Sequence, residues 1–302
     1  MKMVDPKYFT FNFSKDNPPA LRVQDGDTVL FQAMDTYSDL LKTEESVPSV
    51  DMKGVPVNPL NGPVFVEGAM PGDTLKVTIE DIIIDCDYGT MHLNHEGKLG
   101  TKYFKKYVEG EHTFKIPLKD GIADLCGNKL ECIPLIGDIG VAYDKKVMST
   151  MDPYRNGGNM DCKYLRKGTT LYLPVFVEGA LLSAGDLHAH QGDGEIVSGL
   201  EVPGKIQVRV DVVKNRCEGW PVLETEDRWY MLCSAKTIDD AVETVLGEVV
   251  EFLKKRVGDK HSVHEWLLLL AMFGDLEFCE VVDPYVLVRY GIDKKVCEGL
   301  EF

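Results

Sequence analysis

The sequence predicts a mainly β protein made of two related β halves, with a pair of helices near the C-terminus. Three observations support this. Runs of alternating or β-branched apolar residues recur before residue 236, a heptapeptide is repeated among them, and helix-start patterns stand out only later. We expect one domain over 1–302, with β halves at about 1–145 and 146–236, a helical pair at about 237–274 and a terminal strand at about 277–291.

The expected strands are rich in β-branched residues and are bounded by turn residues. They lie at 28–33, 74–84, 170–177 and 205–213. In the last of these, every second residue from Ile206 to Val212 is apolar and the residues between are polar. This alternation is typical of an antiparallel strand with one exposed face. Glycine, proline and polar residues dominate between 85 and 170, so we expect long loops there.

Residues 63–69 and 174–180 carry the same heptapeptide, Pro-Val-Phe-Val-Glu-Gly-Ala. Each copy is soon followed by Gly-Asp, and identity over seven mixed residues indicates two related β units. The wide separation of the copies excludes a solenoid. Both copies contain a glutamate, Glu67 or Glu178, but only the second is followed by histidines. We therefore expect these glutamates to serve the shared turn.

Two helices are expected late in the chain. Thr237 with Asp240 is a capping-box start for a helix that continues over 241–257. Ser262 with Glu265 starts a second helix, which runs through the apolar residues 266–273 and ends at Gly274. The final strand is expected around 285–290. The sequence thus predicts a helical pair followed by one more strand.

Composition restricts the partners and the compartment. The formal net charge is −16, which disfavours nucleic acid and anionic membranes as partners. No apolar run approaches the ~18 residues of a membrane span, and the first residues form no apolar signal region, so we expect a cytoplasmic protein. The 8 cysteines are scattered without a Cys-x-x-Cys pair and are expected to be reduced thiols.

Residues 185–195, Gly-Asp-Leu-His-Ala-His-Gln-Gly-Asp-Gly-Glu, concentrate imidazole and carboxylate groups between glycines. Glycines permit tight turns that bring such side chains to one point. Imidazole and carboxylate together bind divalent cations, most commonly zinc. Because the segment follows the apolar run 171–177, we expect a functional loop just beyond a buried strand, with a solvated surface loop as the alternative.

Two further segments contribute candidate ligands. Asn159 and Asp161 alternate in a Gly-rich stretch and can point to the same side of an extended chain. Asp35 comes directly after the expected strand 28–33. With the 185–195 segment they predict a three-segment metal site. Cys162 beside Lys163 offers a nitrilase-like alternative, although adjacent strand residues point to opposite faces.

Four long motifs resemble the acetamidase/formamidase family, in colinear order over nearly the whole chain. They are Asn58–Asp73, Gly-Gly-Asn-Met-Asp at 157–161, Leu171–Val177 and Gly185–Glu195, with Val-Asp-Pro at 282–284 as a shorter match. The resemblance implies a jelly-roll-like β-sandwich, a bound divalent metal and hydrolysis of short aliphatic amides. Asp35 also matches the family pattern, whereas His190 matches a variable position and is not expected to be a ligand.

We therefore predict metal-dependent hydrolysis of amides such as acetamide and formamide to carboxylate and ammonia, through a metal-activated water. Zinc is the expected metal and calcium the alternative; the candidate ligands are His188, Asp35, Asp161 and Asp186. Glu195 is the expected general base, with Asp193 the next candidate. Gln191 and Asn159 are expected to hold the amide or the developing oxyanion.

The predicted partner is a small amide substrate, and the chain is expected to form a homodimer or a larger homo-oligomer. The alternative function is a non-catalytic β-sandwich that binds a metal or a small ligand. Amide turnover with added zinc would separate this alternative from the predicted enzyme.

Overall fold

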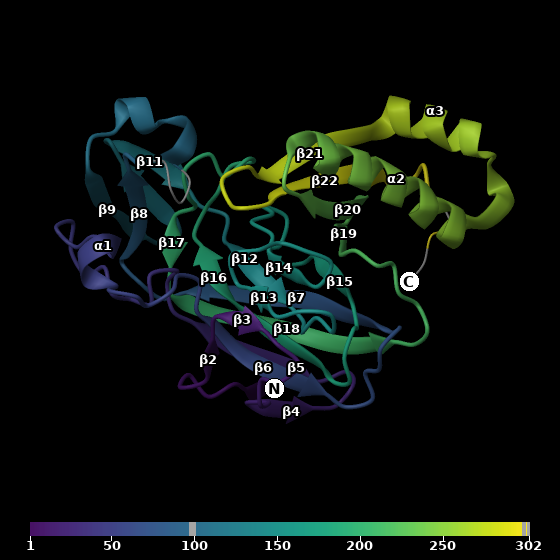
Figure 1. The fold of residues 1–302 in the computed structure, drawn as a ribbon, viewed down its shortest axis with the longest axis horizontal. Helices are drawn as coiled ribbons and strands as arrows, with labels where there is room; N and C mark the ends of the chain where they lie inside the picture. Colours follow the sequence, from purple (N-terminus) through teal and green to yellow (C-terminus); the bar gives the residue numbers. More distant parts are fainter. Residues whose placement is uncertain (97–100, 298–299, 301–302) are drawn as a thin grey trace.

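The computed structural model describes residues 1–96, 101–297 and 300. Two large β-sheets form the body of the protein, and the late helices lie over the end of one sheet, at upper right in Figure 1. Most of the described elements are strands. The prediction of a mainly β protein with a minor helical part is therefore confirmed.

The first sheet contains nine strands within the described residues and is antiparallel except at one edge, where its first strand runs parallel to its neighbour. In spatial order the strands are β1 (Lys2–Met3), β5 (Thr28–Ala33), β18 (Gly204–Val213), β7 (Thr74–Ile84), β15 (Thr170–Pro174), β19 (Val222–Glu224), β20 (Arg228–Ala235), β22 (Val286–Asp293) and β21 (Gly274–Glu280). Strands from both expected halves alternate in this sheet.

The second sheet has a main path and a side branch. The main path is β11 (Asn128–Glu131), β10 (Ile122–Leu125), β9 (Glu111–Lys119), β8 (Tyr88–Asn94), β17 (Glu201–Val202), β16 (Ala180–His188), β12 (Leu135–Gly140) and β14 (Gly157–Asn159). The branch is β6 (Leu60–Val66), which pairs with β16, β2 (Phe9–Thr10) and β4 (Leu21–Val23); separately, β3 (Asn12–Phe13) pairs with β13 (Met148–Ser149).

The main helices are α2 (Ile238–Val257) and α3 (Val263–Phe273), and α2 packs on β20 and β22. The hydroxyl of Thr237 caps α2 by accepting from the backbone N–H of Asp240 at 3.2 Å. Ser262 and Glu265 form the predicted capping box of α3. The shorter helices are α1 (Pro48–Asp51), η1 (Thr101–Tyr103), η2 (Lys105–Tyr107) and η3 (Gly258–Lys260). The sequence therefore identified the starts of both main helices correctly.

Three local predictions were wrong. The region 85–170 contains the strands β8 to β14, which the expectation of long loops missed, although 160–169 contains neither helix nor strand. Strands such as β9 are half exposed and therefore carry many polar residues. The strand expected at 170–177 ends at Pro174. The single terminal strand is a hairpin of β21 and β22, and Gly274 both ends α3 and begins β21 with extended backbone.

The two heptapeptide copies lie side by side. The backbone N–H of Val66 donates to the carbonyl of Gly179 at 2.9 Å, and the N–H of Gly179 donates to the carbonyl of Ala69 at 2.8 Å. Glu67 and Glu178 both lie in turns, as expected. The repeat thus builds a contact between β6 and the start of β16.

The hydrophobic core fills the space between the two sheets. Val77 and Ile206 from the first sheet and Val64, Leu182 and Leu187 from the second belong to one buried cluster. A second cluster lies beneath α2 and α3. Burying apolar surface at about 25 cal/mol per Å² is the main force that holds such layers together.

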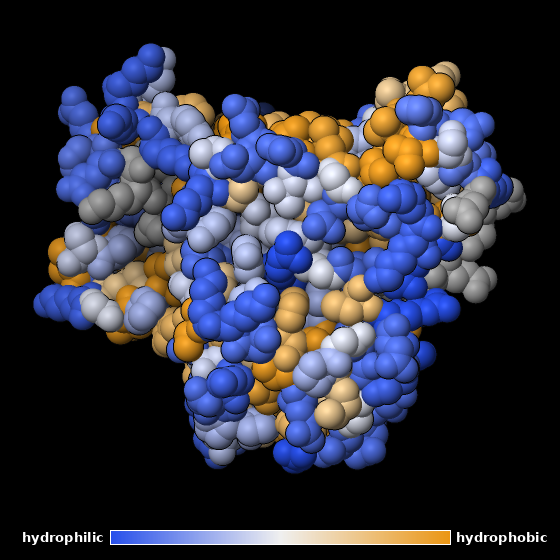
Figure 2. Space-filling view, turned by 45° about the vertical axis from the view of Figure 1, so that its right-hand side comes forward, coloured by the Kyte–Doolittle hydropathy of each residue, from blue (hydrophilic) through white to orange (hydrophobic). Residues whose placement is uncertain are grey.

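The outer face of α3 is also apolar. Figure 2 shows hydrophobic side chains gathered at upper right, over the helical pair. Leu267, Leu268 and Met272 are among the exposed apolar residues there. A helix that is apolar on every side is usually buried on every side. Across the described residues, every helix is too short or too polar to span a membrane.

Candidate functional site

Asp186 and His188 lie at the C-terminal end of β16. All nine residues of β16 are buried, and the strand is paired along both edges, with β12 on one edge and with β6 and then β17 on the other. The prediction of a loop over 185–195 is therefore wrong for 185–188, and only the later residues leave the sheet. The two side chains stand on a fully paired strand, which is a more rigid support than a loop.

Gln191 holds the His188 ring in one tautomer. The Nε2 of Gln191 donates to the backbone carbonyl of Asp161 at 2.6 Å, so its Oε1 faces Nδ1 of His188 at 2.6 Å. Nδ1 therefore carries a proton, and in the neutral ring Nε2 presents a lone pair. Nε2 lies 3.1 Å from Oε2 of Glu201 and 3.7 Å from Oδ1 of Asp186. Such converging acceptors are suited to a cation.

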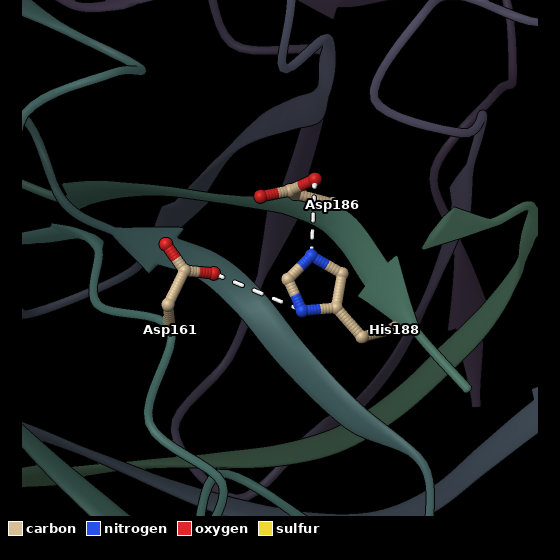
Figure 3. Close-up of side chains that lie close together, drawn as sticks. All are labelled: Asp161, Asp186 and His188. Atoms are coloured by element: carbon tan, nitrogen blue, oxygen red, sulfur yellow. Dashed lines mark ion pairs between the residues drawn. The ribbon is translucent and has the colours of Figure 1, made fainter. Parts of the chain in front are cut away.

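Figure 3 shows Asp161 and Asp186 on either side of the His188 ring. Asp161 follows β14, and its Oδ1 lies 3.9 Å from Nδ1 of His188. One potential ligand atom from each of these three residues falls within 4.8 Å of the others. The structure thus brings together three of the four residues predicted as metal ligands.

Two more triads of the same kind overlap with the first. One consists of His188, Glu195 and Glu201, and the other of Asp161, Glu195 and Asp283. The sequence analysis did not identify Glu201 or Asp283 as site residues. Glu201 reaches the site because β17 pairs with β16 and places it opposite His188.

Burial leaves many of these oxygens without partners. In the described part of the chain, both carboxyl oxygens of Asp161 and of Asp138, Oδ1 of Asp186 and Oε1 of Glu280 are buried without a hydrogen-bond partner. Unpaired buried carboxylates are strongly disfavoured in proteins. The donor set, one imidazole nitrogen with several carboxylates, therefore fits a divalent cation.

The same burial shifts the pKa values of the site. Burial raises the pKa of Asp283 to about 7 and that of Glu201 to about 8. Burial, reinforced by neighbouring carboxylates, raises the pKa of Asp161 and Glu195 well above the ordinary range. Burial lowers the pKa of His188, but Glu201 and Asp186 outweigh it, and the pKa is raised overall. The cluster therefore favours positive charge, as a proton or as a metal ion.

Four site residues have left-handed backbone conformations, with φ of 57° at Asn58, 41° at Asp161, 51° at Asp186 and 41° at Glu195. Such angles are uncommon for residues other than glycine and concentrate at functional sites. Close packing adds a second constraint at Gly137, where a Cβ would lie 2.7 Å from oxygens of both Asp161 and Asp186. The local backbone is thus built around these carboxyl groups.

Asparagine side chains fix the positions of the aspartates. The Nδ2 of Asn58 donates to Oδ1 of Asn159 at 2.9 Å and to Oδ2 of Asp186 at 3.1 Å. The Nδ2 of Asn159 donates to Oδ2 of Asp283. Asn159 therefore lies in the site, as predicted, and Asn58 is a residue that the sequence analysis quoted only as part of a motif.

Three other predicted or considered residues lie elsewhere. Asp35 is outside the triads, and its Oδ1 accepts backbone N–H groups at 2.7 and 3.0 Å. Asp193 forms ion pairs with Lys163 at 2.5 Å and Arg289 at 2.8 Å. His190 is exposed, and its Nδ1 accepts the backbone N–H of Ile133 at 3.1 Å rather than facing the cluster.

The nitrilase-like alternative finds no support in the geometry. Cys162 is fully buried, and its thiol lies beside that of Cys279. The Nζ of Lys163 is paired with Asp193 at 2.5 Å. The thiol therefore does not line the cavity that adjoins the acidic cluster.

A cavity of about 50 Å³ adjoins the cluster. Its polar lining includes Asn58, Asn159, Asp186, Glu195, Glu201 and Asp283, and its other lining residues are Thr36, Tyr37, Val57, Met151, Val197, Ser198 and Val282. Ligand cavities of drug-sized molecules are about 300–1,000 Å³. This one suits a ligand of only a few heavy atoms.

Comparisons with known proteins identify the family of this chain. The sequence profile of the Acetamidase/Formamidase family matches residues 5–152 and 142–227. A crystal structure of an acetamidase from Bacillus halodurans is 34% identical, with a TM-score of 0.92, over 99% of this chain and 100% of the other. A crystal structure of a predicted acetamidase/formamidase from Thermoanaerobacter tengcongensis is 35% identical, with a TM-score of 0.94, and the match covers 100% of this chain and 99% of the other. A formamidase of Methylophilus methylotrophus is 27% identical over 75% of this chain and 71% of its own.

Proposed function

Because the chain belongs to the acetamidase/formamidase family and is an amide hydrolase, we propose that it hydrolyses short aliphatic amides such as formamide and acetamide, with a divalent metal in the cavity beside His188. The observation that carries the proposal is the buried cluster of His188 and unpaired carboxyl oxygens against a cavity of about 50 Å³. The small cavity favours amides with short acyl groups.

His188, Asp161 and Asp186 would hold the cation, with Glu201 beside Nε2 of the imidazole. A bound cation of this kind polarises a carbonyl group and acidifies a neighbouring water. A nitrogen ligand together with carboxylates suits zinc, whereas calcium takes oxygen ligands alone. Gln191 would act by orienting His188, because both ends of its amide are already in use.

Glu195 is proposed as the general base. Its Oε1 accepts the backbone N–H of Gly199 at 3.1 Å, which leaves the other oxygen free on the side of the cavity. From there it can take a proton from the attacking water and return it to the leaving amine nitrogen. Asn159 donates one amide hydrogen to Asp283 and keeps a second one for the substrate oxygen.

The test is to measure ammonia release from formamide and acetamide by protein that has been stripped with a chelator and then reloaded with zinc. We expect activity to disappear on stripping and to return on reloading. Amide turnover by fully stripped protein would contradict the proposed requirement for a bound metal. Stoichiometric metal without any amide turnover would favour the non-catalytic metal-binding alternative.

The remaining proposals concern partners. The net charge of −16 argues against nucleic acid and anionic membranes. The apolar outer face of α3, with Leu268 and Met272 exposed, supports a homodimer or a larger homo-oligomer. A cytoplasmic location stays a prediction from the sequence.

A further inference from the structure

Four carboxyl groups line the cavity beside His188. They belong to Asp186, Glu195, Glu201 and Asp283. Ionised carboxylates accept hydrogen bonds and cannot donate them. A neutral amide presents a carbonyl oxygen, which is another acceptor, and the negative charge on this oxygen grows as water adds to the carbonyl carbon. A side-chain donor that is still free in this cavity is therefore a candidate for binding the substrate oxygen.

Three hydroxyl groups also line the cavity, from Thr36, Tyr37 and Ser198. The Thr36 hydroxyl donates to Oδ1 of Asn58 at 2.5 Å, and the Ser198 hydroxyl donates to the backbone carbonyl of Gly199 at 2.7 Å. Within the described part of the chain, Tyr37 forms hydrogen bonds only through its backbone. Because a hydroxyl has a single proton to donate, Tyr37 is the hydroxyl donor that remains available to a ligand.

Burial makes this free hydroxyl unusual. Tyr37 is 4% exposed, and buried polar groups nearly always have a hydrogen-bond partner. Burial raises the pKa of Tyr37 well above its ordinary value, and the neighbouring carboxylates of Glu201, Asp35 and Asp186 raise it further. The hydroxyl therefore lies within electrostatic reach of the carboxyl groups of the cavity and keeps its proton at neutral pH.

The turn that follows β5 holds Tyr37 in this position. Oδ1 of Asp35 accepts the backbone N–H of Tyr37 at 3.0 Å and that of Asp39 at 2.7 Å. The Tyr37 ring belongs to a buried cluster with Leu41 and Met52. Asp35 thus supports the segment that carries Tyr37, and the ring is fixed by packing. A donor held in this way is preorganised for a ligand.

We propose that the Tyr37 hydroxyl donates a hydrogen bond to the carbonyl oxygen of the amide substrate and thereby selects neutral amides over amidines. This rests on the proposed function, because the ligand is the amide that the cavity would bind. An amidinium ion has a similar shape but presents an N–H donor where the amide presents its oxygen. The carboxylates would attract its positive charge, whereas the Tyr37 donor would oppose it. Tyr37 keeps its proton throughout.

The experiment compares Tyr37→Phe with the wild type, both loaded with zinc. The variant keeps the ring that packs with Leu41 and Met52 and loses only the hydroxyl. Loss of one donor to the oxyanion typically lowers kcat about 10²–10³-fold, and we expect such a fall in ammonia release from acetamide. Zinc content and the urea midpoint should match those of the wild type. An unchanged kcat overturns the role of Tyr37 and leaves the proposed function standing, whereas no turnover by the wild type overturns both.

Tyr290→Phe is the matched control. The Tyr290 hydroxyl is also buried, but it donates to the backbone carbonyl of Leu270 in α3 at 2.8 Å. Its removal should lower the urea midpoint and keep kcat, which is the opposite of the result expected for Tyr37→Phe. An equal fall in kcat in both variants would show that they act through the fold, and would overturn the proposal.

Acetamidine tests the direction of the hydrogen bond. Its inhibition constant against acetamide turnover should fall in Tyr37→Phe, because the variant no longer sets a hydroxyl donor against the N–H donor of the amidinium ion. An unchanged inhibition constant would overturn the proposed selection against amidines. A higher one would mean that the hydroxyl accepts a hydrogen bond from the ligand, and would overturn its assignment as a donor.

Discussion

Gln191 provides a sharp test of how the site is organised. Its amide lies between His188 and Asp161 and makes two hydrogen bonds of 2.6 Å, one to the imidazole and one to a backbone carbonyl. Gln191→Leu keeps a similar volume but removes both. The ring then loses the acceptor that fixes its tautomer, and Nε2 no longer presents its lone pair to the cation reliably.

The expected magnitude follows from these two contacts. Loss of a partner that orients a metal-binding histidine typically weakens metal affinity about 10–100-fold, or about 1.4–2.7 kcal/mol. Loss of two buried hydrogen bonds lowers the free energy of unfolding by about 1–3 kcal/mol. Gln191 is 5% exposed, so water cannot easily replace its amide. We therefore expect a folded, less stable protein with clearly weaker zinc binding.

Competition with a zinc-binding dye measures the dissociation constant, and urea unfolding measures stability. His190→Ala is the matched control, because this neighbouring histidine is exposed and faces away from the cluster. Its zinc affinity should match that of the wild type. If Gln191→Leu also binds zinc as tightly as the wild type, Gln191 does not orient His188 for metal binding, and the reasoning is refuted.

Three further predictions concern the same site, and a fourth concerns the thiol of Cys162. His188→Ala should abolish zinc binding and activity while the chain stays folded; elemental analysis that finds stoichiometric metal would exclude His188 as a ligand. Glu195→Gln should lower the turnover of formamide about 10²–10⁴-fold with at least one metal still bound, whereas a near-wild-type rate would move the base elsewhere. Cys162→Ser should keep most of the activity, and chelator-resistant turnover that is lost in this variant would revive the thiol mechanism. In stripped protein, burial raises the pKa of Glu201 from 4.5 to about 8, so the folded state holds a proton that the unfolded chain has released. The free energy of unfolding should therefore fall as the pH rises from about 4.5 to about 8, by up to about 1.4 kcal/mol per pH unit. Glu201→Gln should flatten this slope in urea unfolding, and an unchanged slope would contradict the raised pKa of Glu201.

The strands predicted best are those whose pattern has one dominant cause. Residues 28–33 and 74–84 match β5 and β7 residue for residue, because β-branched side chains facing the core leave little ambiguity. The helix starts were found for a similar reason, since Ser262 and Glu265 satisfy backbone groups that nothing else reaches. Local chemistry alone decides such elements.

The half-exposed strands of 85–170 were missed although the pattern was present. In β9, Thr113, Ile116 and Leu118 are buried, while polar residues and a proline lie among the others. Overall polarity suggested loops, whereas the alternation of buried and exposed positions describes an antiparallel strand. Periodicity was the better guide there.

The strand that carries the site was missed for a different reason. Asp186 and His188 are polar, and Gly185 lies beside them, so β16 resembles a loop in sequence. In the structure both residues are buried, and the groups that surround them, such as Asp161 and Glu201, come from other parts of the sequence. Local rules fail most often at functional sites, and this strand is an instance.

Glu201 and Asp283 could not be chosen from their own neighbourhoods. Glu201 joins the site through the pairing of β17 with β16, and Asp283 joins it through the turn between β21 and β22. An acid between apolar residues, as at Leu200-Glu201-Val202, is the one sequence feature that could have drawn attention to it. Only the sheet topology shows that these acids converge on His188.

The position of the cluster links metal binding to folding. Two of its proposed ligands, Asp186 and His188, stand on a strand that is paired along both edges, so the fold can hold unpaired carboxyl oxygens together at a cost in stability. A cation that binds only the folded chain returns that stability in proportion to the logarithm of its concentration. The acids that would bind metal are thus the same groups that lower the free energy of unfolding of the metal-free protein. A substitution such as Asp161→Asn should therefore stabilise the stripped chain while weakening metal binding.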